Sequence, residues 1–226
     1  MLRIAFLCSG GGGNLRFVME AIRLGFLTNA EICGVITDRE CPASLFARQN
    51  NIPVSECDFS EKDQPSVITR LLDLDPGVIV SNVHKILSSA VVDSFRGKLV
   101  NLHYSLLPAF GGVIGVKALS QALDYGVQLV GTTVHLVDDL VDAGSPLVQT
   151  AIPVIHGDEI PVLMDIVFRV GCISLLTGVQ LIGGDKQIPS GELRSLMEIS
   201  GRSVLFNPSV ASFPEFQDES FWRRLK

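Results

Sequence analysis

The 226-residue sequence lacks any pair of cysteines at a metal-binding spacing, and it lacks a run of basic residues that would attract a polyanion. The formal net charge of −6 gives no bulk attraction to nucleic acid or to an anionic membrane surface, so we expect neither as a partner. The cysteines are odd in number and lie mostly in apolar stretches, which indicates reduced, buried thiols and no metal site. They are Cys8, Cys33, Cys41, Cys57 and Cys172.

Long hydrophobic runs are also scarce. We find none that approaches the roughly 20 residues that a membrane-spanning helix needs. The N-terminal residues 1–4 enter an apolar stretch directly, without the pattern of a signal peptide. Hydrophobic residues make up 47% of the chain and charged residues 19%, which is ample material for a packed interior. We therefore expect a folded, cytoplasmic protein that does not cross a membrane.

The first hundred residues alternate short β-branched runs with helical patterns. Strands are predicted over residues 4–8, 32–37, 52–57, 77–81 and 99–103. Helices are predicted over residues 14–26, 42–50, 60–74 and 88–95, with Asn14 and Ser60 as N-terminal caps. Apolar strands separated by helices indicate an α/β fold with a mostly parallel sheet covered by helices on both faces.

The pattern changes in the second half of the chain. A helix is predicted over residues 116–125, strands over 129–137 and 147–154, and a long helix over 158–182. This last helix is unusually apolar, which favours burial or an interface such as that of a homodimer. From Gly183 the composition turns polar, so we expect one domain over residues 1–184 and an appendage, residues 185–226, packed on it.

A glycine-rich loop follows the first predicted strand. Ligands of parallel sheets bind beyond the carboxyl ends of the strands, and backbone N–H groups at a helix start can approach an anion there. We assign the binding of a substrate phosphate or carboxylate to Gly10, Gly11, Gly12, Gly13 and Asn14. A dinucleotide site with Asp38 on the ribose is one alternative, although the third glycine of the GxGxxG motif is missing. A purely structural turn is the other.

Asn101 and His103 lie two residues apart at the end of a predicted strand, so their side chains point to the same face. An amide N–H can stabilise a developing oxyanion without ionising, and an imidazole can exchange protons near neutral pH. Asp142 follows in an acidic loop with Asp138 and Asp139, where a solvated turn is the plainer interpretation. Taken together, Asn101, His103 and Asp142 suit acyl or one-carbon transfer, and we predict them as the catalytic residues.

Three ordered motifs also carry a resemblance to a known family. They are Asn101-Leu102-His103-x-Ser105-Leu106-Leu107-Pro108, Gly131-x-Thr133-Val134-His135 and Val141-Asp142-Ala143-Gly144. In this order they resemble the folate-dependent formyltransferases. The loop Ser9-Gly10-x-Gly12-x-Asn14-Leu15 resembles the phosphate-binding loop of the glycinamide ribonucleotide member of that family. The resemblance extends from residue 1 to about residue 157.

The resemblance implies a Rossmann-like formyltransferase fold, 10-formyltetrahydrofolate as the donor, and a small-molecule amine, with or without a phosphate, as the acceptor. It implies that Asn101 and His103 polarise the formyl oxygen and that Asp142 orients His103. The pterin ring of the donor would bind between the segment after the fourth strand and the loop before Asp142. The residues expected there are Val83, His84, Lys85, Ile86, Leu87, Leu136, Val137, Asp138 and Val141.

Several positions depart from the family pattern. Tyr104 stands where a Pro usually follows the catalytic His, and Gly13 replaces a Ser expected to bind phosphate. His84 and Lys85 replace a Met and an Arg in the pterin segment. In the long helix, Val170-Gly171-Cys172 takes the place of polar acceptor-binding residues. The acceptor therefore stays open among a phosphoribosyl amine, an amino sugar, a nucleotide-sugar amine and an amino acid.

Two other functions remain as alternatives. Related deformylases hydrolyse the same donor with the same three catalytic residue types, although their usual regulatory domain is not expected here. A nucleotide-binding module without catalysis is the non-enzymatic alternative. His135, in the strand after Gly131, is expected to pack beside the site rather than to act in it.

Overall fold

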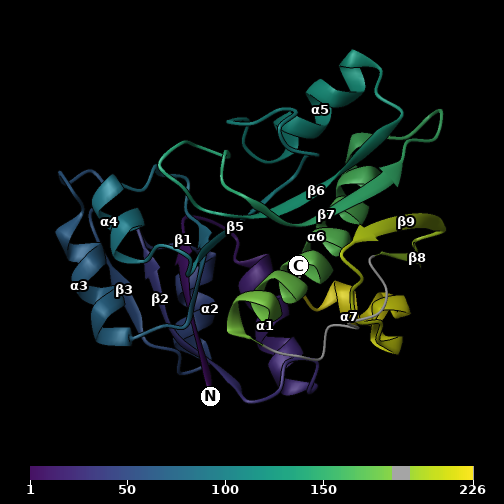
Figure 1. Cartoon of the computed structure of the whole chain (residues 1–226). Helices are drawn as coiled ribbons and strands as arrows, with labels where there is room; N and C mark the ends of the chain where they lie inside the picture. Colours follow the sequence, from purple (N-terminus) through teal and green to yellow (C-terminus); the bar gives the residue numbers. More distant parts are fainter. Residues whose placement is uncertain (185–193, 226) are drawn as a thin grey trace. The chain divides into compact units, whose positions relative to one another are not determined.

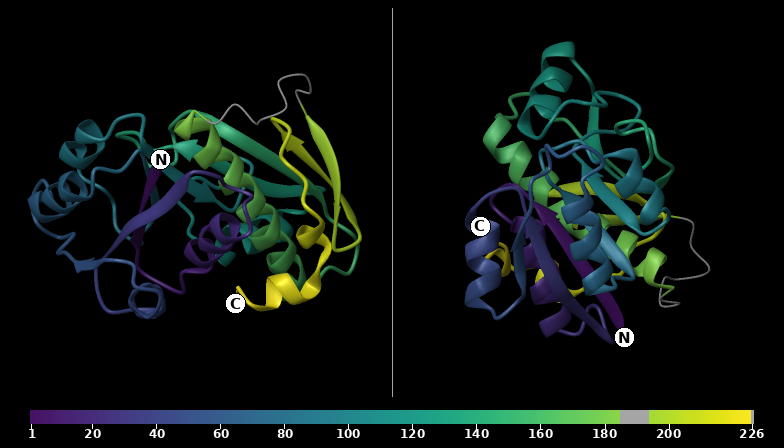
Figure 2. Two further views of the ribbon diagram at one scale, coloured as in Figure 1. Left: turned by 90° about the horizontal axis from the view of Figure 1, so that it is seen from below. Right: turned by 90° about the vertical axis from the view of Figure 1, so that its left-hand side faces the viewer.

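The computed structural model describes residues 1–184 and 194–225, shown in Figures 1 and 2. The chain divides into two compact units. The first unit comprises Met1–Asn101 and Leu136–Val141, and the second comprises Leu102–His135 and Asp142–Lys226. The predicted boundary between residues 184 and 185 falls at the start of 185–193, which lie outside the described residues.

The first unit is built on parallel strands in the order β3-β2-β1-β4-β5. The strands are β1 (Leu2–Cys8), β2 (Ala30–Thr37), β3 (Val54–Glu56), β4 (Val78–Asn82) and β5 (Leu99–His103), whose last two residues belong to the second unit. The intervening helices are α1 (Gly13–Arg23), α2 (Pro42–Gln49), α3 (Pro65–Leu74) and α4 (Ser89–Ser94). The predicted α/β class with parallel strands is thus confirmed.

Helices cover both faces of these strands because the central strands are largely apolar. Figure 1 shows α1 and α2 on one side of the strands and α3 and α4 on the other. On the side of α3 and α4, side chains from β1, β4, α3 and α4 form a buried core that includes Leu7, Ile79, Leu71 and Val91. All four are fully buried, and burying such side chains contributes about 1.5–3 kcal/mol each.

Two predicted helix starts were wrong. Helix α1 begins at Gly13 with Gly12 as its N-cap residue, so Asn14 lies inside the first turn. Helix α3 begins at Pro65 rather than near Ser60. The Asp58 carboxylate accepts hydrogen bonds from the backbone N–H (2.8 Å) and the hydroxyl (2.6 Å) of Ser60, which holds this stretch in a turn. Gln64, at φ 51°, precedes Pro65, which suits the first helical position.

The strands of the second unit pair antiparallel in the order β6-β7-β9-β8. Its strands are β6 (Leu129–Leu136, the last residue in the first unit), β7 (Pro146–Pro153), β8 (Ser195–Ile199) and β9 (Arg202–Asn207). Its helices are α5 (Val116–Tyr125), α6 (Ile160–Gly183), the 3₁₀ turn η1 (Pro214–Gln217) and α7 (Glu219–Arg223). The β8–β9 hairpin was not predicted.

Helix α6 is the core helix of the second unit and packs across one face of its strands (Figure 2). Our expectation of no apolar stretch of membrane-spanning length was wrong, because α6 has 24 residues and an 18-residue window of mean hydropathy 1.9. That window is 78% buried inside the protein. Gly178 allows the close approach, since a Cβ there would lie 2.6 Å from Cγ1 of Val134 on β6. The fold itself therefore accounts for the apolar composition of α6.

The C-terminal residues are tied to the second unit by pairing and by aromatic packing. Strand β9 pairs with β7 from Gln149 opposite Asn207 onward. Phe221 and Trp222 are fully buried, and the Trp222 indole N–H donates to the Phe216 carbonyl at 3.0 Å. Although the chain is polar after Gly183, its residues 195–223 form a regular hairpin and a small aromatic cluster.

Candidate active site

One position in the glycine loop after β1 has a backbone shape that requires glycine. Gly12 has φ +75°, and a Cβ at this position would lie 2.9 Å from the Cβ of Ala43. No side chain caps α1, so the N–H groups of its first turn are not used by a cap. Gly11 is exposed. The loop therefore has the geometry that we predicted for an anion site, and anion binding there stays a prediction.

The loop is joined to the predicted pterin segment within the first unit. The Ser9 hydroxyl accepts a hydrogen bond from the His84 backbone N–H at 2.9 Å. Val83 and Leu87 pack on the core of the first unit together with Val137, whereas the Ile86 side chain is 75% exposed. His84 and Lys85 are also exposed.

A buried glutamine that sequence reasoning missed holds this segment. Gln64 is almost fully buried, and its amide N–H groups donate to the Phe59 carbonyl (2.8 Å) and the Ile86 carbonyl (3.0 Å). Its amide oxygen accepts the backbone N–H of Ser88 at 2.9 Å. The backbone of the segment is thus fixed while its central side chains face solvent.

The loop before Asp142 shows the same mixture in the first unit. Val137 is partly buried and its backbone N–H donates to the Leu99 carbonyl at 2.9 Å. Asp138 is exposed, as are Leu140 and Val141, at 71% and 56%. Exposed aliphatic side chains held on a fixed backbone suit the face of a flat ring, which agrees with the predicted role without testing it.

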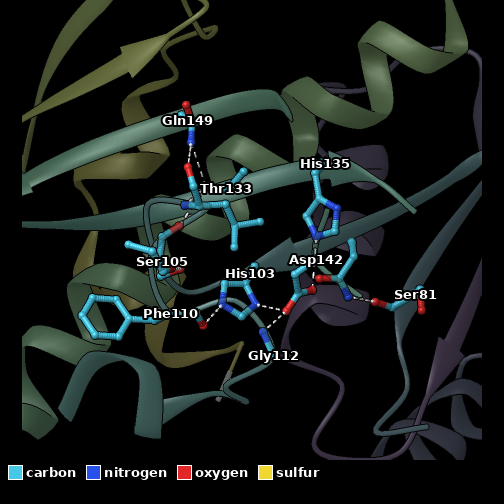
Figure 3. A network of polar contacts seen from close by, with 12 residues as sticks. Ser81, His103, Ser105, Phe110, Gly112, Thr133, His135, Asp142 and Gln149 are labelled. Carbon is cyan, nitrogen blue, oxygen red and sulfur yellow. Dashed lines mark hydrogen bonds and ion pairs between the residues drawn. The ribbon is translucent and has the colours of Figure 1, made fainter. Parts of the chain in front are cut away.

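His103 and Asp142 meet in the second unit (Figure 3). His103 is buried at the end of β5, and its Nδ1 lies 3.3 Å from Oδ2 of Asp142. Its other ring nitrogen, Nε2, lies 3.1 Å from the carbonyl oxygen of Phe110. A carboxylate on one nitrogen and a carbonyl on the other fix the orientation of the ring, and the carboxylate is the partner that a proton-handling imidazole needs.

Asp142 is held from three sides. Its Oδ2 accepts the Gly112 backbone N–H at 2.8 Å, and its Oδ1 lies 3.5 Å from Nε2 of His135. The close contact with His135 lowers the pKa of Asp142 below its ordinary value of 3.8. Burial opposes this shift, and the Gly112 N–H and the charge of His103 add to it. Asp142 is therefore a carboxylate at neutral pH, held by two histidines and one peptide.

His135 lies beside the site, where the sequence placed it. It is 2% exposed, and the structure adds that its Nε2 lies 3.5 Å from the second carboxylate oxygen of Asp142. The available signal was alternation along β6, because Gly131, Thr133 and His135 share one face of that strand. The sequence does not predict the turn that brings Asp142 to this face. In that turn Asp142 itself has φ 54°.

A polar network fixes the loop that follows His103. The Thr133 hydroxyl donates to the Ser105 carbonyl at 2.8 Å and accepts the Leu107 backbone N–H at 3.1 Å. The Gln149 amide donates to the Leu107 carbonyl at 2.9 Å. The Ser105 hydroxyl donates to the Ala109 carbonyl at 2.5 Å. Residues 105–109 are thus anchored on β6 and β7, as Figure 3 shows.

Asn101, the third predicted catalytic residue, belongs to the first unit, where it ends the segment Met1–Asn101. One N–H of its side-chain amide donates to the Ser81 carbonyl at 2.5 Å on the neighbouring strand β4. An amide nitrogen has two N–H donors, so this bond fixes the side chain and leaves a second donor. Its action together with His103 and Asp142 stays a prediction.

Two departures noted in the sequence are in contact within the second unit. A Cβ on Gly171 of α6 would lie 3.0 Å from Cδ2 of Leu102 and 3.1 Å from Cε1 of Tyr104. The Tyr104 ring therefore crowds the place of a side chain at position 171. Val170 and Cys172, on either side, are fully buried.

The five cysteines are free and buried, as predicted. Burial raises the pKa of Cys8 to about 12, and the nearby Cys41 adds to the shift. Burial likewise raises the pKa of Cys172. The thiols of Cys8 and Cys172 are thus protonated at neutral pH and are poor nucleophiles. Among the described residues, no group of three or more His, Cys, Asp or Glu side chains is arranged to hold a metal ion.

Comparison with known proteins places the chain in a family. The formyl transferase family matches residues 2–176. Phosphoribosylglycinamide formyltransferase of Mycobacterium tuberculosis is 35% identical over 165 residues, which cover 70% of this chain and 74% of that protein. The human trifunctional purine biosynthetic protein adenosine-3 is 35% identical over 171 residues, 72% of this chain and 16% of the longer protein.

Solved structures agree. Glycinamide ribonucleotide transformylase 1 from Symbiobacterium toebii has a TM-score of 0.75 at 25% identity and covers 93% of each chain. The enzyme of the same name from Geobacillus kaustophilus has a TM-score of 0.74 at 28% identity, covering 80% of this chain and 98% of its own. The chain belongs to the formyl transferase family. The predicted resemblance, the fold and an enzyme of folate-dependent formyl transfer are thereby confirmed.

Proposed function

We propose that this enzyme transfers the formyl group of 10-formyltetrahydrofolate to the amine of a small phosphorylated acceptor, as the names of its relatives in purine biosynthesis indicate. The observation that carries the proposal is the contact of His103, buried at the end of β5, with Asp142: Nδ1 of His103 lies 3.3 Å from Oδ2 of the carboxylate. A binding module has no need for a carboxylate held against a histidine, whereas acyl transfer does.

In the proposed reaction the acceptor nitrogen attacks the formyl carbon, and a C–N bond forms while the formyl oxygen gains negative charge. Protonated His103 and the free N–H of Asn101 hydrogen-bond to that oxygen. Asp142 orients His103 and takes the proton that the acceptor nitrogen loses. The intermediate then collapses as the bond between the formyl carbon and N10 of the folate breaks, and N10 receives that proton.

The residues predicted to bind the phosphate of the acceptor and the pterin of the donor belong to the first unit. The loop Gly10–Asn14 would bind the acceptor phosphate through backbone N–H groups at the start of α1. The segment Val83–Leu87 and the residues Leu136, Val137, Asp138 and Val141 would bind the pterin of the donor. The fixed backbones of both segments support these roles, since a preformed site loses less entropy on binding.

A second class of acceptor is favoured by one observation. Gly171 has no side chain, and the Leu102 and Tyr104 side chains lie 3.0 and 3.1 Å from where its Cβ would stand, so a side chain there would have to displace them. An acceptor-binding polar group at that place in α6 is therefore absent from this chain. An amino sugar, a nucleotide-sugar amine or an amino acid would lose no binding contact by this change. These three are the alternatives to a phosphoribosyl amine.

The test is the consumption of 10-formyltetrahydrofolate with and without a panel of amines that begins with phosphoribosylglycinamide. Formyl transfer predicts release of tetrahydrofolate only when an amine is present, with one formylated amine formed per donor consumed. Donor turnover in buffer alone would show hydrolysis instead. Binding of NAD(P) without any turnover would show the nucleotide-binding module.

We further propose a cytoplasmic location and leave a homodimer as a prediction. Five free, buried thiols suit a reducing compartment and support the location. The apolar helix α6 is used within the second unit, so the argument that suggested a dimer interface is weakened by its burial. Light scattering of the purified protein measures the oligomeric state directly.

A further inference from the structure

One short backbone segment of the second unit contacts both catalytic side chains at once. The Phe110 carbonyl oxygen lies 3.1 Å from Nε2 of His103. Two residues later, the Gly112 backbone N–H donates to Oδ2 of Asp142 at 2.8 Å. Figure 3 shows the two contacts side by side, on the two groups to which we assign the chemistry. We call residues 110–112 the tip segment.

The tip segment presents the same two functional groups as the reactants. The peptide carbonyl of Phe110 is an amide carbonyl, as is the N-formyl group of the donor. The Gly112 N–H stands where the N–H of an attacking amine would hand its proton to Asp142. We propose that the tip segment is an internal mimic of the two reacting groups, which occupies the site between turnovers and has to leave before the formyl oxygen and the amine can bind. This inference rests on the proposed function, which supplies the roles of His103 and Asp142.

The local structure allows the tip to leave while its base stays in place. Residues 105–109 are anchored by Thr133 and Gln149 through bonds of 2.8–3.1 Å. Beyond them Gly111 and Gly112 are exposed. The Phe110 carbonyl also accepts the Val113 N–H at 3.3 Å, so the tip is a single turn. Rotation of that one turn frees both catalytic groups together.

The backbone of the tip is held in a conformation that is unfavourable for most residues. Phe110 has φ +59° and Gly112 has φ +78°, both in the left-handed region. A side chain at φ above zero is strained, and Phe110 carries that strain in the occupied state. Gly112 carries none, because it is glycine. A substitution at 112 therefore changes the balance between the occupied and open states.

The variant Gly112→Ala tests the proposal cleanly. A Cβ at position 112 meets no atom within 4 Å, so the only effect of alanine is strain in the left-handed conformation of the occupied state. Only enzyme in the open state can bind substrate, so the apparent affinity rises with the open fraction. Because alanine destabilises the occupied state, we expect kcat/KM to rise about two- to fivefold. Gly126→Ala is the matched control, since Gly126 has φ +86°, also has nothing within 4 Å and ends helix α5.

A second measurement needs no turnover, so it separates the failure of this inference from the failure of the proposed function. Amide hydrogen exchange at Gly112 in the full-length wild-type protein should be slow, and it should accelerate when 10-formyltetrahydrofolate is added. In Gly112→Ala the amide at position 112 should exchange faster than in wild type without any addition.

Two results would overturn the inference. One is an unchanged or lower kcat/KM for Gly112→Ala when the melting temperature falls no further than in Gly126→Ala. The other is rapid exchange at Gly112 in the wild-type protein, which would mean that the tip does not occupy the site. If no amine is formylated by the wild type, the proposed function fails, and the exchange measurement alone decides whether the tip segment occupies the site.

Discussion

At the scale of single residues, the site depends on how Asp142 is held. A carboxylate that only oriented His103 would need one contact, but Asp142 has three partners: His103, His135 and the Gly112 N–H. These partners favour the charged form, so the pKa of Asp142 is lowered in the folded state. The carboxylate is thus a structural as well as a chemical element of the site.

The lowered pKa of Asp142 predicts how stability depends on pH. A carboxyl group with a folded-state pKa below its ordinary 3.8 stabilises the protein above pH 3.8, and this contribution is lost as the pH falls through the folded-state value. We expect the wild type to be more stable than Asp142→Asn at pH 7 and at pH 5, with the difference shrinking below about pH 3.8. Urea unfolding of both proteins across this range is the measurement. A difference that grows towards acid pH would contradict the argument.

His135 is predicted to be a positioning residue that acts through Asp142. Its contact with the carboxylate is the largest cause of the lowered pKa, so His135→Asn should raise the pKa of Asp142. The acid limb of the kcat/KM profile should then move to higher pH, and kcat should fall about tenfold. His156→Asn is the control, because His156 is exposed. An unshifted acid limb in His135→Asn would leave His135 with a packing role only.

At the scale of elements, the contact of α6 with β6 decides how closely the second unit packs. A Cβ on Gly178 would lie 2.6 Å from Cγ1 of Val134, and the β-branched valine has little freedom to turn away. Gly178→Ala should therefore destabilise the protein by about 1–2 kcal/mol, despite the better helix propensity of alanine. Thermal or urea unfolding measures the change.

The matching control is the same substitution in a Val134→Ala background. Removing the two methyl groups of Val134 removes the clash, so Gly178→Ala should there become neutral or stabilising. The same loss of stability in both backgrounds would show that the contact does not limit the packing of α6.

The elements also show what the sequence could and could not predict. The apolar strands and amphipathic helices of the first hundred residues follow from local pattern, and all five predicted strands lie within two residues of their observed limits. The β8–β9 hairpin was missed because residues 195–207 alternate weakly and follow a polar stretch, although Ser200-Gly201 is a turn signal with both residues at positive φ.

At the site, the residue types were predictable and the contacts were not. His103 and Asp142 were recognised from motif and chemistry. The role of His135, the support by Thr133 and Gln149, and the contacts of Phe110 and Gly112 depend on turns that set residues far apart in sequence against each other. Such turns have no periodic signal in the sequence, so contacts beyond the strand ends could not be predicted from local pattern.

At the scale of the whole molecule, each unit carries a different set of the residues to which we assign a role. The first unit carries the glycine loop and the segments proposed for the anion and the pterin. The second carries His103 and Asp142 with the network that fixes them. Tyr104 and Gly171 lie in the second unit as well, so the chemistry is retained while the neighbourhood that would select an acceptor has changed. Selectivity for the amine is therefore the property in which this enzyme should differ most from its relatives.

The most direct test of the central claim is transfer of a labelled formyl group from 10-formyltetrahydrofolate to an amine by the wild type, Asp142→Asn and Asp124→Asn. Asp124 is exposed on α5 and serves as the control for loss of one negative charge. We predict that Asp142→Asn loses transfer by about 10²- to 10⁴-fold with its fold intact, while Asp124→Asn keeps wild-type turnover. Wild-type turnover in Asp142→Asn would contradict the assignment of the site.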